Sequence, residues 1–486
     1  MGRYAVQMRT GVVGAVRGRR ASGTLIVFAL IVIVFALIAG AATVRFPLAG
    51  ILLAGASVLM LAWPVFQRLA REASWALPLV VAVLAILSDH GALASSTGML
   101  RYAATAIVLA VVVAMRGRGA RTGYGLWMSA AVLCCYGLLG TIYGRLYLGT
   151  QDGALPVVLP MLICLGGWAR QVGDDRQLRF ALKVIAFLCS IYALMCAVFR
   201  LVGLIDEQAV FSHEKAFLMV LAVASAVAAR SRWLTVFSLV STLAAFATYP
   251  AATYVVAGLS GLLTLGLVRW SPDRTTRTVL GVGGMAGVLW AVLNVDSLVQ
   301  LTGTYFTLVG KTDNGSTRAA LYNSALRQLS NEPVFARLFT GDLTVSTTLD
   351  GQSGVVLPIH NDYLGVALTG GIVASALLLS VFMFANGYAI HAISVYGSSS
   401  TRGRAITALL ASLNAAAVIA FANPVFMNPG TSTAVYAIIC ALVSLCVGGV
   451  VTAPQAPGRS DPPDRESTRL AQAHQVELGP SPAPLQ

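Results

Sequence analysis

A histidine followed by an asparagine is the residue pair in this sequence best suited to proton transfer. The chain contains five His, and His360 opens the run His360-Asn361-Asp362 directly before an apolar segment. A neutral imidazole at the start of an apolar helix can accept a proton from a hydroxyl group. The alternative is that His360 and Asn361 only cap the helix that follows.

Basic residues around Arg318 form a candidate phosphate site. Arg318 stands one helical turn before Tyr322, and a guanidinium fork pairs with two phosphate oxygens at once. Together with Arg327 and Arg337, it suits an anionic lipid headgroup. A simple anchor at a lipid surface would explain the same residues.

A second basic group lies earlier in the chain. His213-Glu214-Lys215 begins an apolar run, and the free N–H groups of a helix start attract anions. Lys215 in this position suits a phosphate, and Arg200, at the end of the preceding run, is a lesser candidate for the same role. The alternative is an ordinary cluster of interfacial charges.

Motifs for other chemistries are missing from the sequence. It contains no P-loop, no GxGxxG between a strand and a helix, no HExxH and no GxSxG. The seven Cys all fall inside apolar runs without the spacing of a metal site, so we expect neither a metal centre nor a disulfide framework.

The elements that position these residues must lie in a membrane. Of the 486 residues, 57% are hydrophobic and only 11% are charged, whereas soluble proteins carry about 25% charged residues. This excludes a typical cytosolic enzyme, a disordered protein and a coiled coil. The net charge of +14 is explained by Arg anchors in loops rather than by a nucleic-acid partner. We expect an all-α, polytopic membrane bundle of about 12–14 transmembrane helices.

Apolar runs divide the chain into five predicted parts. These are a basic cytoplasmic N-terminus at 1–21, transmembrane helices over 22–296, an extracytoplasmic loop at 297–361, further transmembrane helices over 362–451 and a disordered cytoplasmic tail at 452–486. The predicted spans lie near 22–43, 46–66, 75–90, 102–115, 124–144, 154–169, 180–199, 214–230, 233–248, 252–268, 278–295, 362–385, 405–423 and 431–451.

Arg residues alternate between loops and so predict the orientation. Clusters occur at 68–71, 116–121, 170–179, 230–232, 269–277 and 402–404, while most loops between them carry few basic residues. By the positive-inside rule both termini are cytoplasmic and the loop 297–361 faces outward. Within that loop Leu321, Ala325 and Leu329 form one apolar stripe. The stretch Ser316–Leu329 is therefore predicted to be an amphipathic helix against the outer membrane face.

Several motifs follow one another in an order that resembles a known family. They are Arg318-Ala319-Ala320-Leu321-Tyr322-Asn323-Ser324-Ala325-Leu326, Asn331-Glu332-Pro333-Val334-Phe335, His360-Asn361-Asp362-Tyr363-Leu364 and Gly370-Gly371-Ile372. This order resembles the hallmark of the O-antigen ligase/polymerase superfamily. Phe211-Ser212-His213-Glu214-Lys215 resembles the family's short motif before an earlier helix. The family's basic pair is missing near Thr248–Thr253, so either another Arg supplies that charge or the placement is wrong.

The resemblance implies a fold of the GT-C type and a reaction. Members transfer a glycan from a polyprenyl diphosphate to an acceptor on the outer face of the bacterial cytoplasmic (inner) membrane. Arg318 would hold the diphosphate, and His360 would orient or deprotonate the acceptor hydroxyl. The other residues implied in substrate binding are Lys215, His213, Arg200, Tyr322, Asn361 and Asp362. No metal, nucleotide sugar or other cofactor is required.

The resemblance also implies partners and leaves alternatives. The expected partners are the lipid-linked glycan, membrane lipid, and a chain-length regulator and a flippase of the same pathway. A polysaccharide polymerase is the leading hypothesis. The alternatives are a ligase or protein-glycosylating relative, a flippase for lipid-linked oligosaccharides, and a general transporter. A flippase should carry charges deep in the bundle, whereas here the charges lie in one outer loop and at helix ends.

Overall fold

The computed structural model describes residues 63–88, 97–114, 124–143, 154–165, 172–201, 213–248, 252–270, 315–331, 337–340, 344–349, 352–359, 361–421 and 423–447. The predicted N-terminus at 1–21, the spans at 22–43 and 278–295, and the tail at 452–486 lie outside the described residues. So does His360.

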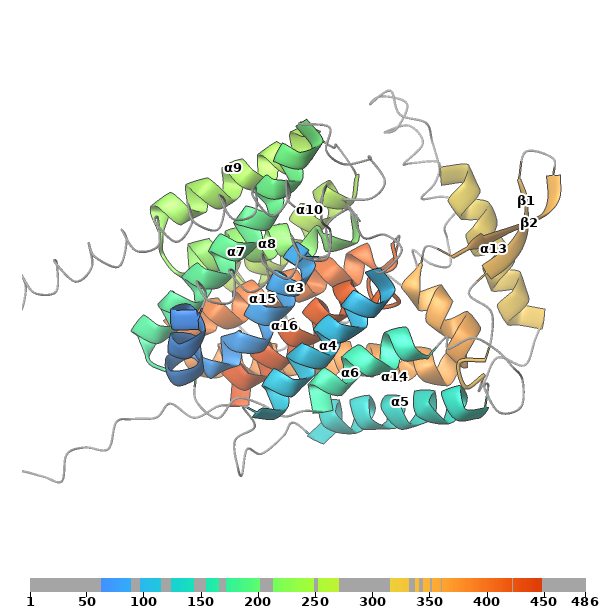
Figure 1. The fold of residues 1–486 in the computed structure, drawn as a ribbon, viewed down its shortest axis with the longest axis horizontal. Coiled ribbons are helices and arrows are strands. Elements are labelled where there is room, and N and C mark those ends of the chain that lie inside the picture. Colours follow the sequence, from blue (N-terminus) through green and yellow to red (C-terminus); the bar gives the residue numbers. More distant parts are fainter. Residues whose placement is uncertain are drawn as a thin grey trace, which may run out of the picture. The chain divides into compact units, whose positions relative to one another are not determined.

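The described residues form helices and one small hairpin (Figure 1). The elements are a helix over 63–72, η1 (Ser74–Ala76), α3 (Leu77–Ser88), α4 (Thr97–Ala114), α5 (Tyr124–Tyr143), α6 (Leu155–Leu165), α7 (Asp175–Leu201), η3 (His213–Lys215), α8 (Phe217–Ala228), α9 (Arg232–Thr248), α10 (Ala252–Trp270), α13 (Gly315–Asn331), β1 (Thr344–Leu349), β2 (Gln352–Pro358), α14 (Asp362–Tyr396), α15 (Thr401–Ile419) and α16 (Pro429–Val447).

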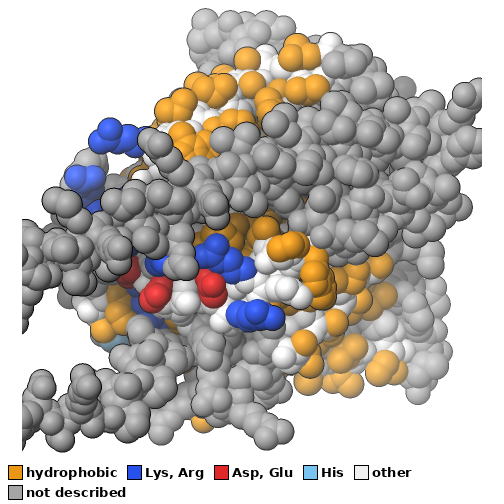
Figure 2. All heavy atoms as spheres, turned by 60° about the vertical axis from the view of Figure 1, so that its left-hand side comes forward, with side chains coloured by type: hydrophobic (Ala, Val, Ile, Leu, Met, Phe, Trp, Pro, Cys, Tyr) orange, Lys and Arg blue, Asp and Glu red, His pale blue; other side chains and the backbone are white. Residues whose placement is uncertain are grey.

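The helical prediction is confirmed in outline. Each predicted span from 75–90 onward that falls on described residues coincides with a helix. Among the described residues, four helices are long and apolar enough to cross a membrane: α5, α7 over Asp175–Val198, α14 and α16. Acidic and basic side chains lie close together in one area, further basic side chains lie at the upper left, and apolar side chains cover much of the other described surface in that view (Figure 2). These features are those of an α-helical membrane protein; a total of about 12–14 crossings stays a prediction.

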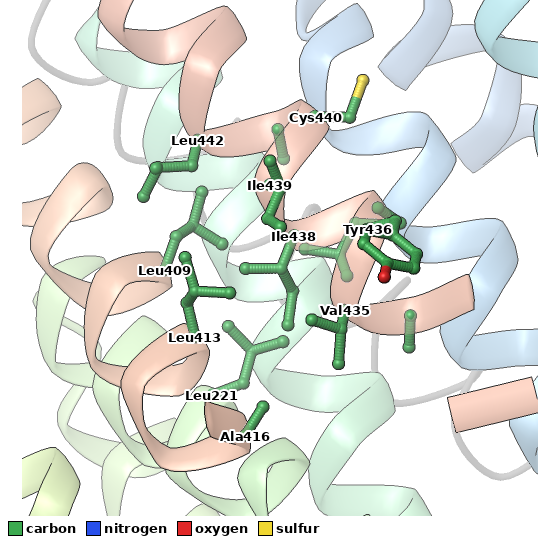
Figure 3. Close-up of a cluster of buried hydrophobic side chains, with 14 of the residues drawn as sticks. Leu221, Leu409, Leu413, Ala416, Val435, Tyr436, Ile438, Ile439, Cys440 and Leu442 are labelled. Atoms are coloured by element: carbon green, nitrogen blue, oxygen red, sulfur yellow. The ribbon is translucent and has the colours of Figure 1, made fainter. Parts of the chain in front are cut away.

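Two helices, α15 and α16, form the centre of the core. Almost every α15 residue from Thr401 to Ala416 and every α16 residue from Thr431 to Leu445 is buried. Leu409 and Leu413 of α15 interdigitate with Ile438 and its neighbours on α16 (Figure 3). Alanines on several sides of α15 allow neighbouring helices to approach it closely. In lipid, where the hydrophobic effect does not drive helices together, such close packing stabilises their association.

Hydroxyl pairs tie helices together inside this core. Thr105 of α4 and Thr433 of α16 share a hydrogen bond of 2.6 Å. Ser190 of α7 and Ser238 of α9 share one of 2.8 Å. Such bonds between membrane helices contribute about 0.6–2 kcal/mol each.

The long loop contains the predicted helix, but the helix is covered by protein. Leu321 and Ala325 of α13 are buried in one apolar cluster with Val345 of β1 and Leu364 of α14. The apolar stripe therefore packs on the chain itself, and this corrects the expectation that it lies against the membrane. The hairpin, in which Thr344 pairs with Pro358, was not predicted from the sequence.

A sharp kink divides α14 into two parts. Gly371 has φ 80° and ψ −178°, a backbone conformation that side chains other than hydrogen disfavour. We call the part before the kink, residues 362–370, the α14 arm. The part from Ile372 to Tyr396 is about 37 Å long at 1.5 Å per residue, enough to cross a hydrocarbon core of about 30 Å.

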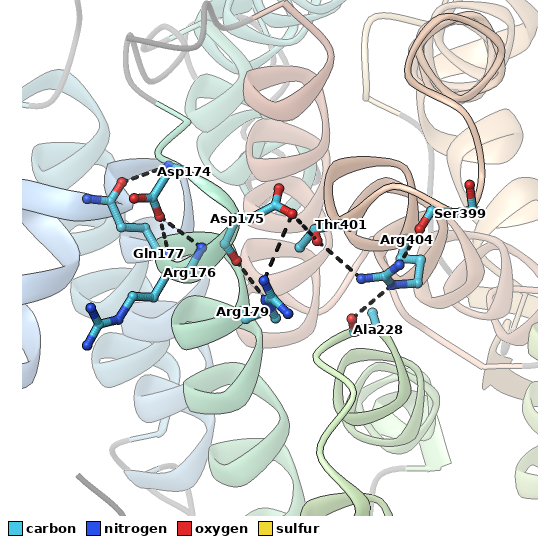
Figure 4. A network of polar contacts seen from close by, with 9 residues as sticks. All are labelled: Asp174, Asp175, Arg176, Gln177, Arg179, Ala228, Ser399, Thr401 and Arg404. Atoms are coloured by element: carbon cyan, nitrogen blue, oxygen red, sulfur yellow. Dashed lines mark hydrogen bonds and ion pairs between the residues drawn. The ribbon is translucent and has the colours of Figure 1, made fainter. Parts of the chain in front are cut away.

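Predicted cytoplasmic loops meet at one end of the bundle (Figure 4). Thr401, at the start of α15, donates to the Asp175 carboxylate at the start of α7 over 2.8 Å. Arg404 donates to the Ala228 carbonyl over 3.2 Å at the end of α8. Arg402 donates to the Leu445 carbonyl over 2.7 Å near the end of α16. Helix ends beside three of the Arg clusters therefore meet in one region, and its cytoplasmic orientation stays a prediction.

The two ends of α14 generate a topology prediction. Arg327 on α13 and Ser398 after α14 are both exposed and flank the helix. In intact cells an impermeant maleimide should label Arg327→Cys, and it should label Ser398→Cys only after permeabilisation. The parent chain, with its own cysteines, is the control. Labelling of both variants from the same side would mean that α14 does not cross the membrane.

Candidate functional site

Most predicted site residues lie on a few elements at the other end of α14. These elements are α13, the start of the α14 arm, η3, the end of α7, and the segment 420–428 between α15 and α16, which we call the α15–α16 loop. They place the site at the termini of helices rather than within the core.

Tyr322 anchors α13 to this end of the bundle. Its hydroxyl donates to the Phe421 carbonyl over 3.1 Å, and its ring meets the Phe421 ring edge-on with centroids 6.4 Å apart. Burial raises the pKa of Tyr322 to about 12, although the Arg318 charge one turn earlier opposes the shift. Tyr322 therefore remains a neutral donor at physiological pH, and Arg318 is half-buried on the same helix.

Asn361 caps α14, as the alternative interpretation of this motif predicted. Its backbone is extended, and its side-chain oxygen accepts the Leu364 N–H over 3.1 Å. The side chain is fully buried. Capping by Asn contributes about 1 kcal/mol, and it fixes the residue at which the α14 arm begins.

Asp362 holds the α15–α16 loop. Its carboxylate accepts the backbone N–H groups of Val425, Phe426 and, over 3.3 Å, Met427. Its own N–H donates to the Ala420 carbonyl over 2.9 Å. The side chain is 1% exposed. Asp362 was predicted to bind substrate, but the structure commits its carboxylate to backbone donors, so its role is to position neighbouring residues.

The second basic group surrounds the end of α7. Lys215 is 5% exposed, and all three guanidinium nitrogens of Arg200 are shielded from solvent. Lys215 ends η3, and Arg200 lies in the last turn of α7. The backbone of His213 belongs to η3, whereas its side chain lies outside the described residues.

The α15–α16 loop joins the two groups and was missed in the sequence. Asn428 donates to the Glu214 carboxylate over 2.8 Å, while the preceding residues bind Asp362. The signal was available in two Asn-Pro dipeptides, Asn423-Pro424 and Asn428-Pro429, because Asn-Pro marks turns.

The arrangement favours binding of an anion at a helix end. Arg318 lies on α13, whose Tyr322 bonds Phe421 of the α15–α16 loop, and Lys215 lies on η3, whose Glu214 bonds Asn428 of the same loop. Partly desolvated cations interact with phosphate more strongly than exposed ones. Among the described residues, no group of three His, Cys, Asp or Glu side chains could hold a metal ion.

Comparisons with known proteins give no match. No protein-family model matches the chain, and no curated protein matches it either. A functional assignment therefore rests on the residues and their arrangement.

The Asp362 contacts predict a large effect of a small substitution. Asp362→Asn replaces one acceptor oxygen by an NH2 group that faces backbone donors, so we expect a loss of about 1.5–3 kcal/mol. Thermal unfolding in detergent, followed by tryptophan fluorescence, measures it. The matched control is Asp174→Asn, since Asp174 accepts two N–H groups at the exposed start of α7 and Asn caps as well there. Equal stability of both variants would contradict the assigned role of Asp362.

Proposed function

We propose that this chain is a multi-pass glycosyltransferase of the bacterial cytoplasmic membrane. It would polymerise polyprenyl-diphosphate-linked oligosaccharide repeat units on the outer face of that membrane. The observation that carries the proposal is the convergence of α13, bearing Arg318, and the α14 arm, which follows His360, on one end of an apolar bundle. The described parts of two motifs that resemble the O-antigen ligase/polymerase superfamily, Arg318–Leu326 and Asn361–Leu364, are therefore neighbours in space as well as in order.

The proposed donor suits a site at a helix end. A polyprenyl chain belongs in lipid, and its diphosphate belongs at the interface, next to Arg318. The missing basic pair near Thr248–Thr253 has a candidate substitute in Arg200 and Lys215. η3, which carries Lys215, packs against α10. The Lys215 charge is thus available close to the helix that carries the basic pair in the family.

The proposed reaction is a displacement at the anomeric carbon of the donor. The acceptor hydroxyl oxygen forms a bond to that carbon, and the bond from the carbon to the diphosphate oxygen breaks with its electron pair. His360 takes the hydroxyl proton. Negative charge grows on the leaving diphosphate, so Arg318, Lys215 and Arg200 stabilise the transition state more than the ground state.

The placement of charge favours a transferase over a flippase. The buried charged side chains of the described residues, Lys215, Asp362 and Arg402, and the shielded guanidinium of Arg200 all lie at or next to a helix end. A flippase path would need polar groups along the bundle interior. A ligase would use the same donor site, so polymerase and ligase are separated by their products.

His360→Ala generates the first functional prediction. Loss of the base should reduce glycan transfer by about 10²–10⁴-fold, while membrane insertion is unchanged. When this variant is expressed in a host that lacks the native gene, single repeat units should still be exported and should accumulate on their lipid carrier. The matched control is His391→Ala, because His391 is exposed near the far end of α14. Normal polymer from His360→Ala would contradict the assignment.

The same host separates the competing functions by size-fractionated glycans. Without the gene, loss of long chains with repeat units still exported indicates a polymerase. Long lipid-linked chains that never reach their acceptor indicate a ligase. Repeat units trapped on the cytoplasmic leaflet indicate a flippase, and both of the last two results contradict the proposal.

Arg318→Lys tests the phosphate contact. A lysine keeps the charge but loses the bidentate fork, so we expect a loss of about 10²-fold in transfer rate. Arg327→Lys on the same helix is the control, since Arg327 is exposed. Purified protein in nanodiscs with lipid-linked repeat units gives the rates. Full activity of Arg318→Lys would reduce Arg318 to a lipid anchor.

A further inference from the structure

The kink in α14 is held by side chains from outside the helix. A kink leaves backbone carbonyls without their helical N–H partners. Here Arg337 donates to the Leu368 carbonyl over 2.9 Å, and Tyr136 donates to the Gly370 carbonyl over 2.7 Å. Carbonyls at the break are therefore satisfied by two elements that are distant in sequence.

The Tyr136 hydroxyl is the centre of this arrangement. Besides donating to Gly370, it accepts the backbone N–H of Leu338 over 3.0 Å. One oxygen atom thus connects α5, the turn at 337–340 and the α14 kink. The Tyr136 ring also meets the Phe339 ring edge-on, with centroids 6.1 Å apart.

The turn at 337–340 is strained. Leu338 and Phe339 have φ of 49° and 58°, in a region that L-residues other than Asn and Asp rarely adopt. The turn is closed by Thr340, whose N–H donates to the Arg337 carbonyl over 2.9 Å. Strained turns persist only where the surroundings hold them.

A glycine on α5 allows the turn to pack directly against that helix. A β-carbon at Gly140 would lie 1.6 Å from the Leu338 carbonyl oxygen, so the backbone of the turn sits directly on α5. On the other side, a β-carbon at Gly370 would come within 3.1 Å of the Phe339 ring. The turn is wedged between α5 and the kink.

We propose that Tyr136 is a positioning residue that sets the angle of the α14 arm. Its hydroxyl holds the arm in place against α13, so that the start of the arm and Arg318 keep the relative positions that the reaction needs. The arm and α13 move together because Leu321 of α13 packs in one cluster with Leu364 and Leu368 of the arm. The catalytic part of this inference rests on the proposed function, whereas the mechanical part does not.

Tyr136→Phe tests the contribution of the hydroxyl separately from that of the ring. It keeps the packing on Phe339 and removes both hydrogen bonds. Hydrogen–deuterium exchange of the full chain in nanodiscs should be roughly tenfold faster in peptides covering 337–340 and 364–375, because one to two buried bonds are lost. Peptides of α16 should be unchanged.

Two controls isolate this effect from general destabilisation. Thr105→Val removes a buried hydroxyl bond between α4 and α16, neither of which bonds the turn or the kink in the contacts described above, so it should leave exchange at 337–340 and 364–375 unchanged. Tyr124→Phe makes the same substitution at an exposed position of α5. Equal exchange in Tyr136→Phe and the parent chain, or equal acceleration in Thr105→Val, would overturn the proposal.

Kinetics then test the positioning role. With lipid-linked repeat units, Tyr136→Phe should lower kcat about tenfold with an unchanged KM for the donor, because Arg318 still binds the diphosphate while the reacting groups are misaligned. Faster exchange with an unchanged kcat would overturn the positioning role. A parent chain that transfers no glycan contradicts the proposed function instead, and the exchange result stands independently of it.

Discussion

Every backbone polar group that leaves a regular helix inside an apolar bundle must find another hydrogen-bond partner, and the candidate site depends on how this chain meets that requirement. α14 breaks at Gly371, and Arg337 and Tyr136 take over the exposed carbonyls. At the other end of the arm, Asp362 accepts the N–H groups of the α15–α16 loop. The arm is therefore bonded at both ends, and residues at its start have a defined place relative to α13.

The same apolar interior restricts where charge can lie. Arg402 is buried, yet its guanidinium donates to the Leu445 carbonyl and stacks on the Tyr396 ring at 4.0 Å. At the opposite end, the Asp362 carboxylate accepts backbone N–H groups. Glu214, next to Lys215, accepts a hydrogen bond from Asn428. Buried charges are tolerated where helix ends supply unpaired backbone partners. A site for an anionic headgroup is consequently built at helix ends, leaving α15 and α16 free to pack through alanine and leucine.

Local patterns predicted the helices but not the way in which they meet. Apolar runs predicted the helices, and the stripe of Leu321 and Ala325 predicted α13. Both patterns can be found in a sequence because a helix depends on residues that are close together in the chain. The kink is different: Tyr136 and Gly370 are 234 residues apart. Asp362 and Val425 are 63 residues apart, so the carboxylate resembled a substrate ligand in sequence while it serves the fold. The hairpin was missed because its strands, rich in Ser, Thr and Gly, lack a clear alternation.

The strain in the turn at 337–340 is offset by the contacts that the turn makes with α5 and with the kink. Two left-handed residues, Leu338 and Phe339, cost about 2–4 kcal/mol together. Burial of the Phe339 ring returns about 1.5–3 kcal/mol, and the two hydrogen bonds of Tyr136 add about 1 kcal/mol each. These magnitudes nearly cancel, so the turn keeps its shape only while it contacts both α5 and α14. A change at either contact should release the other, which makes the turn and the kink one cooperative unit between the long loop and the membrane-crossing part of α14.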